Sequence, residues 1–278
     1  MKVKILGTAA YERVPAMFCN CPACRTALKD GGKSIRTQAQ AILDDAVLID
    51  FGGDNYIHFI NCGADFSAMR ALLITHTHSD HFNKEDLEMR QPPYGHDPSS
   101  ATLKVFACKA CADAVSDFVS PEGGVCAAVL TPYTPVRFEK YTITPLPAAH
   151  PTSEPFVYII SDGNKTLFYC LDTGLLKDED YDFLKNGGFV FDAVISDCTY
   201  GLMDMENCPG HMSLKDNLTH RERLLKLGAL KKGAPWIITH FSHNGLVLNG
   251  RGVTHEELET IAEKHGMIAA FDGMETVF

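Results

Sequence analysis

The sequence predicts an α/β protein made of layers with mixed β-sheets. Short β-rich runs dominate the first half of the chain, and two of them pass through turn residues into a second run, which indicates hairpins. Capped helices become clear in the second half. Strands that alternate with helices and hairpins favour stacked α/β layers. Because no linker rich in glycine, serine or charge divides the 278 residues, we expect a single domain over residues 1–278.

The predicted strands begin at the N-terminus with residues 1–7. Residues 41–50 have the pattern of a hairpin that turns at Asp44-Asp45. Residues 71–75 form a brief apolar strand, as expected where both faces of a sheet are covered. Residues 157–169 form a second hairpin around strong turn residues.

Two later helices have clear N-terminal signals. Ser213 and Asp216 form a capping-box pattern, and Thr254 opens another helix that Gly266 should end. In contrast, residues 82–100 contain two adjacent prolines and are predicted to be irregular, and the sequence leaves open whether they form a mobile lid. The apolar face expected of the first helix consists of Leu214, Leu218, Leu224 and Leu225.

Composition and charge restrict the class of partner. Lys and Arg total 25 against 35 for Asp and Glu, a net charge of −10, so an extended nucleic acid is a poor partner. A small anion held by metal ions is still compatible with this charge. The ten cysteines come without a secretory signal pattern, so we expect a cytoplasmic protein in which clustered thiols bind metal. No apolar stretch approaches the ~20 residues of a membrane span.

The most informative segment directly follows the apolar strand at 71–75. His76, His78, Asp80 and His81 are four potential ligands within six residues. A strand that ends in a tight loop can turn them into one pocket, and three imidazoles with a carboxylate suit zinc, manganese or iron. The alternative is a solvated polar loop without a ligand, which this density of histidine disfavours.

This segment resembles the His-x-His-x-Asp-His signature of the metallo-β-lactamase superfamily. The resemblance implies a four-layer αββα sandwich with two mixed sheets and a metal centre at one edge of the paired sheets. It also implies three further ligands on later strand ends. The candidates are His150, Asp172 and His240, the last of which follows the apolar run 236–239.

Carried over by position, the resemblance divides these residues between two metals. It implies that Asp172 bridges the two ions. Taken singly, Asp172 could be a turn residue and His150 an edge residue, but their joint occurrence in this order favours ligands. The implied sets are His76, His78 and His150 for one ion, and Asp80, His81 and His240 for the other.

A second cluster, Cys19, Cys21 and Cys24, has the spacing of a zinc knuckle that lacks one ligand. His243 is the candidate for the fourth ligand, because it lies three residues after His240. A closed site of this kind would be structural and would pin the loop at about residues 15–26. The alternative is three free thiols.

These features together are similar to a bacterial group of cyclic-phosphate phosphodiesterases that accompany carbon–phosphorus lyase. Gly7-Thr-Ala-Ala, the cysteine motif, Thr-His-Phe-Ser-His at 239–243 and Phe271-Asp-Gly-Met274 carry this likeness. The transfer-RNA 3′-processing ribonucleases come next and share the Gly-His-Met-Ser pattern of residues 210–213. Those enzymes typically carry a substrate-gripping arm, and this sequence has no long insertion of that kind.

The same resemblance suggests roles around the metals. His211 is a candidate catalytic residue near the scissile phosphate, or else an exposed residue ahead of a helix. Asp80 is the second catalytic candidate and also a metal ligand. Asp50 and Asp197 lie at strand ends, where they either orient ligand imidazoles or cap turns.

The function that these expectations imply is a dinuclear metal-dependent phosphodiesterase. Its active-site ions would be manganese or zinc, or iron in their place, with one structural zinc. Its substrate would be a small anionic phosphodiester such as a cyclic nucleotide or a ribose phosphate. The sequence leaves the oligomeric state open, and the resemblance allows a homodimer because the family is often dimeric. The alternatives on this scaffold are an RNA 3′-processing nuclease, a lactonase, a thioesterase, a mononuclear-iron sulfur dioxygenase or a non-catalytic zinc-binding protein.

Overall fold

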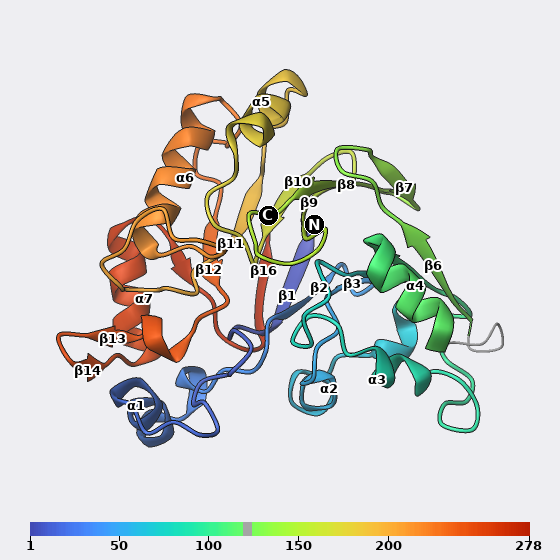
Figure 1. Cartoon of the computed structure of the whole chain (residues 1–278), viewed down its shortest axis with the longest axis horizontal. Coiled ribbons are helices and arrows are strands. Elements are labelled where there is room, and N and C mark those ends of the chain that lie inside the picture. The colour runs from blue at the N-terminus through green and yellow to red at the C-terminus, as the bar shows by residue number, and fades with distance from the viewer. Residues whose placement is uncertain (119–123) are drawn as a thin grey trace.

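The computed structural model describes residues 1–118 and 124–278. Two seven-stranded sheets lie side by side in the middle, with helices on both outer sides (Figure 1). Both sheets mix parallel and antiparallel pairs, so the αββα layer order and the mixed sheets predicted above are confirmed. In the described part of the chain, no helix is long and apolar enough to cross a membrane.

The first sheet has the strand order β16-β1-β2-β3-β4-β5-β6. The four strands from β3 to β6 are parallel, whereas β16, β1 and β2 pair antiparallel with their neighbours. The strands are β1 (Lys2–Gly7), β2 (Gln40–Leu43), β3 (Val47–Ile49), β4 (Ala71–Leu73), β5 (Leu103–Ala107), β6 (Val125–Val129) and β16 (Met274–Val277).

The second sheet has the strand order β15-β12-β11-β10-β9-β8-β7. Strands β10, β11, β12 and β15 are parallel, and β7, β8 and β9 continue the sheet as an antiparallel meander. A separate short hairpin joins β13 (Val247–Leu248) to β14 (Arg251–Gly252). The strands are β7 (Val136–Phe138), β8 (Tyr141–Pro147), β9 (Phe156–Ser161), β10 (Thr166–Cys170), β11 (Ala193–Asp197), β12 (Trp236–Thr239) and β15 (Ile268–Ala269).

The helices form two outer groups, one beside each sheet (Figure 1). The first group is α2 (Asn55–Cys62), α3 (Lys84–Glu88) and α4 (Lys109–Phe118), and the second is α5 (Asp178–Asn186), α6 (Leu214–Lys226) and α7 (His255–Lys264). Helix α1 (Pro22–Asp30) packs against β14. Short 3₁₀ turns are η1 (Gly32–Ser34), η2 (Phe66–Ala68) and η4 (His243–Gly245).

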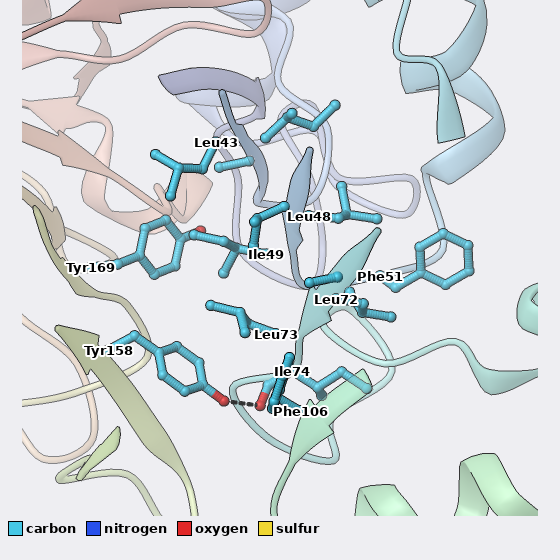
Figure 2. Packing of buried hydrophobic residues seen from close by; sticks show 14 of the residues in the cluster. Leu43, Leu48, Ile49, Phe51, Leu72, Leu73, Ile74, Phe106, Tyr158 and Tyr169 are labelled. Carbon is cyan, nitrogen blue, oxygen red and sulfur yellow. Dashed lines mark hydrogen bonds between the residues drawn. The ribbon is translucent and has the colours of Figure 1, made fainter. Parts of the chain in front are cut away.

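The core between the sheets is made by strands that are apolar on both faces. In β9, Tyr158 and Ile160 join the cluster shared with the first sheet, while Val157 and Ile159 join the cluster under the second group of helices. Successive side chains of a strand point to opposite faces, so a continuous apolar run fills both layers. Figure 2 shows Tyr158 and Tyr169 of the second sheet beside Leu43, Ile49 and Leu73 of the first.

The two predicted hairpins are present. Asp44 and Asp45 between β2 and β3 both have positive φ, 48° and 53°, which matches the twist of a tight hairpin. In the β9–β10 hairpin, Asp162 Oδ1 accepts the N–H groups of Asn164 and Lys165 at 2.9 and 2.8 Å. Both hairpins therefore turn at the residues that the sequence indicated.

Helix α6 begins with the predicted capping box at Ser213, but only half of its predicted apolar face is buried: Leu224 lies in the core and Leu214 packs against it. Leu218 is 36% exposed and Leu225 is 49% exposed. Asn217 and His220 are buried in their place, and Asn217 Oδ1 accepts the indole N–H of Trp236 at 2.9 Å. Polar partners on the second sheet decide which face is buried, so the leucine-stripe prediction is wrong in part.

The segment 82–100 is more regular than expected. It contains α3, and Phe82 and Leu87 are buried in the core, so the prediction of an irregular segment is wrong for residues 84–88. Helix α7 agrees with the sequence, because Thr254 makes its capping box and Gly266, just past its end, has φ of 64°.

Candidate metal centre

The predicted ligands follow strand ends that meet at one edge of the two sheets. Strands β8, β10, β11 and β12 run in the same direction, so the residues after their carboxyl ends lie together. These residues include His150, Asp172 and His240. The loop after β4 brings His76 to His81 to the same edge, where Phe156 N–H of the second sheet donates to Thr75 O at 2.8 Å.

Asp172 lies at the centre of this cluster. Its Oδ2 is 2.9 Å from His81 Nε2 and 3.0 Å from His240 Nε2. Its Oδ1 is 3.7 Å from His150 Nε2 and 4.0 Å from His76 Nε2. One carboxylate thus faces both predicted ligand groups, which is the geometry that a bridging ligand requires.

The two predicted ligand groups are each compact. His78 Nδ1 lies 3.3 Å from His150 Nε2, and the potential ligand atoms of His76, His78 and His150 lie within 4.8 Å of one another. Asp80 Oδ2 and His240 Nε2 are each 3.3 Å from His81 Nε2. The structure therefore brings all seven predicted ligands together.

The chemistry of these donors fits bound cations. His76 Nε2 and Asp172 Oδ2 are buried and have no hydrogen-bond partner among the described residues, although two imidazoles lie close to the carboxylate. Burial lowers the pKa of His76 well below its ordinary value, which leaves a neutral imidazole. Burial alone would raise the pKa of Asp172, but His240 and His81 hold it well below its ordinary value. Imidazole nitrogens together with carboxylate oxygens are the donor set of divalent transition metals.

Outer hydrogen bonds fix the orientation of the ligand imidazoles. Asp50 Oδ2 lies 2.7 Å from His81 Nδ1, Thr199 Oγ1 lies 2.8 Å from His240 Nδ1, and Gly210 O lies 2.9 Å from His150 Nδ1. In each case the second ring nitrogen, Nε2, is left for the centre. Such partners set the tautomer of a metal-binding histidine.

Asp50 and Asp197 fill both roles that the sequence left open. Asp50 Oδ1 accepts the Thr75 N–H at 2.8 Å while its other oxygen holds His81. Asp197 Oδ1 accepts the N–H of Met212 at 2.8 Å while Oδ2 lies 3.0 Å from His211 Nδ1. Each carboxylate thus caps a turn and orients a histidine.

Three residues of the centre adopt backbone conformations that are unusual for them. Asp50, Asp172 and His240 each follow a strand and have φ of 63°, 47° and 63°. Left-handed conformations cost energy for residues other than glycine and concentrate at functional sites. Here they end three strands sharply at the edge where the candidate ligands meet.

His211 lies beside the candidate ligands. Its Nδ1 is 3.0 Å from Asp197 Oδ2 and 3.9 Å from Asp172 Oδ1, and it belongs to a group with His150 and Asp172 that could itself hold a metal ion. Burial opposes its protonation, but Asp197 outweighs burial and raises the pKa of His211. Its side chain is 21% exposed, so the alternative of a freely exposed residue ahead of the helix does not hold.

A cavity of about 500 Å³ opens onto this centre. Among the described residues that line it, none is a lysine or an arginine. Seven of the lining residues were not predicted as site residues: Ala10, Tyr11, Glu12, Ser79, Thr199, Ser242 and Asn244. Ala10, Ser79 and Ser242 lie within motifs described above, and Thr199 is two residues past the strand-end Asp197. The lining residues are Ala10, Tyr11, Glu12, His78, Ser79, Asp80, His150, Asp172, Thr199, His211, His240, Ser242 and Asn244.

The cysteine cluster also assembles as predicted. The potential ligand atoms of Cys19, Cys21, Cys24 and His243 lie within 4.8 Å of one another, and His243 Nδ1 is 3.3 Å from Cys21 Sγ. Burial opposes ionisation of Cys21, but hydrogen bonds from the Cys24 N–H and from His243 lower its pKa to about 6. A thiolate at the start of α1 with three further donors is a group that could hold a metal ion.

The sequence of residues 42–241 matches the family model of the beta-lactamase superfamily domain. The chain belongs to this superfamily. The match contains all seven candidate ligands of the metal centre, whereas the cysteine cluster lies outside it. No curated protein matches the chain in a sequence search.

Solved structures of this superfamily fold share the architecture at low sequence identity. A diphosphatase from the PhnP family is 19% identical with a TM-score of 0.74, and the match covers 100% of this chain and 97% of that one. Zn²⁺-bound PqqB from Methylobacterium extorquens is 17% identical with a TM-score of 0.71 over 100% of both chains. The short form of human tRNase Z is 16% identical with a TM-score of 0.63 over 100% of this chain and 99% of that one.

Proposed function

We propose that this superfamily member is a metal-dependent hydrolase that cleaves small phosphodiesters. The observation that carries the proposal is the convergence of seven candidate ligands, five of which line one cavity. Two buried donor atoms of these ligands have no hydrogen-bond partner among the described residues. His76, His78 and His150 would hold one cation, Asp80, His81 and His240 the other, and Asp172 both. Bound cations of this kind neutralise a phosphodiester and lower the pKa of water.

The residues around the proposed cation sites have two further roles, which are to orient the ligand imidazoles and to protonate the leaving group. Asp50 and Thr199 keep His81 and His240 oriented, so that their Nε2 atoms face the centre. Hydrolysis breaks one P–O ester bond, and the leaving oxygen needs a proton. His211 is the proposed donor: Asp197 holds its Nδ1 at 3.0 Å, so Nε2 is available to the leaving group. Such a donor contributes ~10²–10⁴-fold.

The charge of the cavity favours a substrate with a single phosphoryl group. None of its described lining residues is a lysine or an arginine, so only the cations would balance phosphate charge. A polynucleotide or a polyphosphate carries several charges and usually needs basic side chains. We therefore propose a small diester. The likeness in fold to a PhnP-family diphosphatase supports phosphoryl chemistry in general, and the choice of a single phosphoryl group rests on the cavity lining alone.

The proposal is tested by assays of the metal-loaded protein on an aryl phosphodiester, a thioester and a lactone. We expect turnover of the phosphodiester, and exclusive turnover of the thioester or lactone would overturn the proposal. The His211→Ala variant should keep its metal content and fold. It should lose ~10²–10⁴-fold on diesters with a poor alkoxide leaving group and much less on activated aryl diesters. Equal losses on both substrates would contradict the role of His211.

A further inference from the structure

The turn at residues 10–13 contributes Tyr11 and Glu12, which are not candidate metal ligands, to the lining of the same cavity. Arg13 N–H donates to Ala10 O at 3.0 Å, so Tyr11 and Glu12 occupy the two central positions of a turn. Ala10 N–H donates to Phe241 O at 3.1 Å, and Arg13 Nε donates to both carboxylate oxygens of Asp54 at 3.0 and 2.8 Å. These contacts hold the turn beside the loop that carries His240.

Glu12 has one engaged oxygen and one free oxygen. Its Oε1 accepts a hydrogen bond from Ser242 Oγ and lies 3.8 Å from His243 Nε2. Its Oε2 receives no hydrogen bond from the residues that the structure describes, and the side chain is 31% exposed. Because Arg13 is paired with Asp54, it does not neutralise Glu12. A carboxylate oxygen is therefore available to whatever fills the cavity.

A free carboxylate is unexpected in a cavity proposed to bind an anion. It repels the phosphoryl group, and the contacts of Glu12 are with Ser242 and His243 instead of the seven candidate metal ligands. A carboxylate accepts hydrogen bonds and attracts cations, so it is suited to a donor group on the part of the substrate that does not react. Tyr11 beside it is 61% exposed and adds an aromatic surface to this part of the cavity.

We propose that Glu12 selects diesters whose second alcohol arm carries a hydrogen-bond donor, either a hydroxyl or an ammonium group. The inference rests on the phosphodiesterase function proposed above and names the kind of diester. The other role open to Glu12 is structural: through His243 it could only support the cysteine site. If the role of Glu12 is structural, its removal should change kcat/KM for all substrates by the same factor. If Glu12 selects the substrate, its removal should change the ratio of kcat/KM between substrates.

The test uses the metal-loaded full chain and three p-nitrophenyl phosphodiesters with the same leaving group. Their second arms are propyl, 3-hydroxypropyl and 3-aminopropyl. For the wild type we expect kcat/KM for a donor arm to exceed that for propyl by about tenfold or more, as a hydrogen bond to a charged group permits. Glu12→Ala should bring the ratio close to one. Glu12→Gln retains a hydrogen-bond acceptor but loses the negative charge. It should therefore keep part of a preference for the hydroxyl arm and lose a preference for the ammonium arm, which shows which of the two donor groups Glu12 recognises.

Each variant is also measured for zinc content and melting temperature. Glu256→Ala removes an exposed carboxylate from α7 and serves as the matched control with the wild-type ratio. If all three diesters are hydrolysed and the ratio of kcat/KM between donor arm and propyl arm is the same in the wild type and in Glu12→Ala, the inference is overturned and the proposed function stands. A uniform loss on all three with loss of zinc would assign Glu12 the structural role and overturn the inference too. No hydrolysis of any diester by the metal-loaded wild type would overturn both proposals.

Discussion

Replacing Asp50 by asparagine changes one atom behind the candidate metal centre. Asparagine tolerates the φ of 63° at this position, so the backbone should keep its course. Its Oδ1 can still accept from Thr75 N and Thr75 Oγ1, which lie 2.8 and 2.9 Å from the carboxylate. Its amide nitrogen, however, would face His81 Nδ1 at the 2.7 Å position of Oδ2. Two donors cannot share that contact, so His81 must move its proton to Nε2, the atom that faces Asp172.

This tautomer change is expected to weaken metal binding more than folding. Loss of an outer partner of a ligand histidine typically costs ~10–100-fold in metal affinity, or about 1.4–2.8 kcal/mol. Asp50→Ala, in contrast, orphans the Thr75 N–H and leaves His81 Nδ1 only the longer contact with Thr75 Oγ1 at 3.4 Å. One orphaned buried donor costs about 1–3 kcal/mol of folding stability.

Competition titration of zinc or manganese against a chromophoric chelator measures the affinity, and urea unfolding of the metal-free protein measures the stability. Asp86→Asn is the matched control, because it makes the same chemical change beside Asn55, away from the centre. We expect wild-type affinity for Asp86→Asn. Wild-type affinity for Asp50→Asn would refute the orienting role of Asp50.

Three further predictions follow from other parts of the chain. Cys21→Ser should lower the melting temperature by several degrees through loss of the structural metal. The control Cys126→Ser, which changes an exposed thiol, should keep the melting temperature of the wild type. Equal melting temperatures of the two variants would argue against a metal at the cysteine cluster. Gly52→Ala should reduce metal occupancy, because a Cβ at this position would lie 2.0 Å from Asp80 O. In the control Gly53→Ala, the new Cβ meets only the ends of side chains at 3.2 and 3.3 Å, so this variant should bind metal normally. Metal analysis compares the two variants, and equal metal contents would contradict the prediction. Burial lowers the pKa of His58 to about 4 and that of His220 to about 3, below the ordinary 6.5, so the unfolded chain takes up these protons first. The contribution of these histidines to the free energy of unfolding should therefore be fully present above about pH 6.5. It should fall toward pH 4 by up to ~1.4 kcal/mol per pH unit for each histidine. Urea unfolding at pH 7 and 5 tests this, and an equally steep fall of the unfolding free energy in His220→Gln and in the wild type would show that His220 does not contribute.

The sequence predicted those features that depend on residues close to one another in the chain. The turn at Asp44-Asp45 and the caps at Ser213 and Thr254 depend on residues within a few positions of each other, and the structure has all of them. The clustered motif at residues 76–81 is local in the same sense. His150, Asp172 and His240 were found by resemblance and by their order after strand-like runs, since parallel strand ends meet at one edge.

The sequence was uninformative where distant partners decide. Leu218 and Leu225 had the spacing of a buried face, but Asn217 and His220 are buried because Trp236 and Tyr181 provide their hydrogen-bond partners. Glu12 and Ser242 are 230 positions apart, so their contact at the cavity has no local pattern. Tertiary contacts of this kind override local spacing.

The most direct test of the central claim is an anomalous difference map from crystals of the protein loaded with manganese. We expect two peaks ~3.5–4 Å apart: one beside His76, His78 and His150, the other beside Asp80, His81 and His240, and both next to Asp172. A map without a peak among these residues after loading with manganese, and again with zinc, would contradict the proposed metal centre.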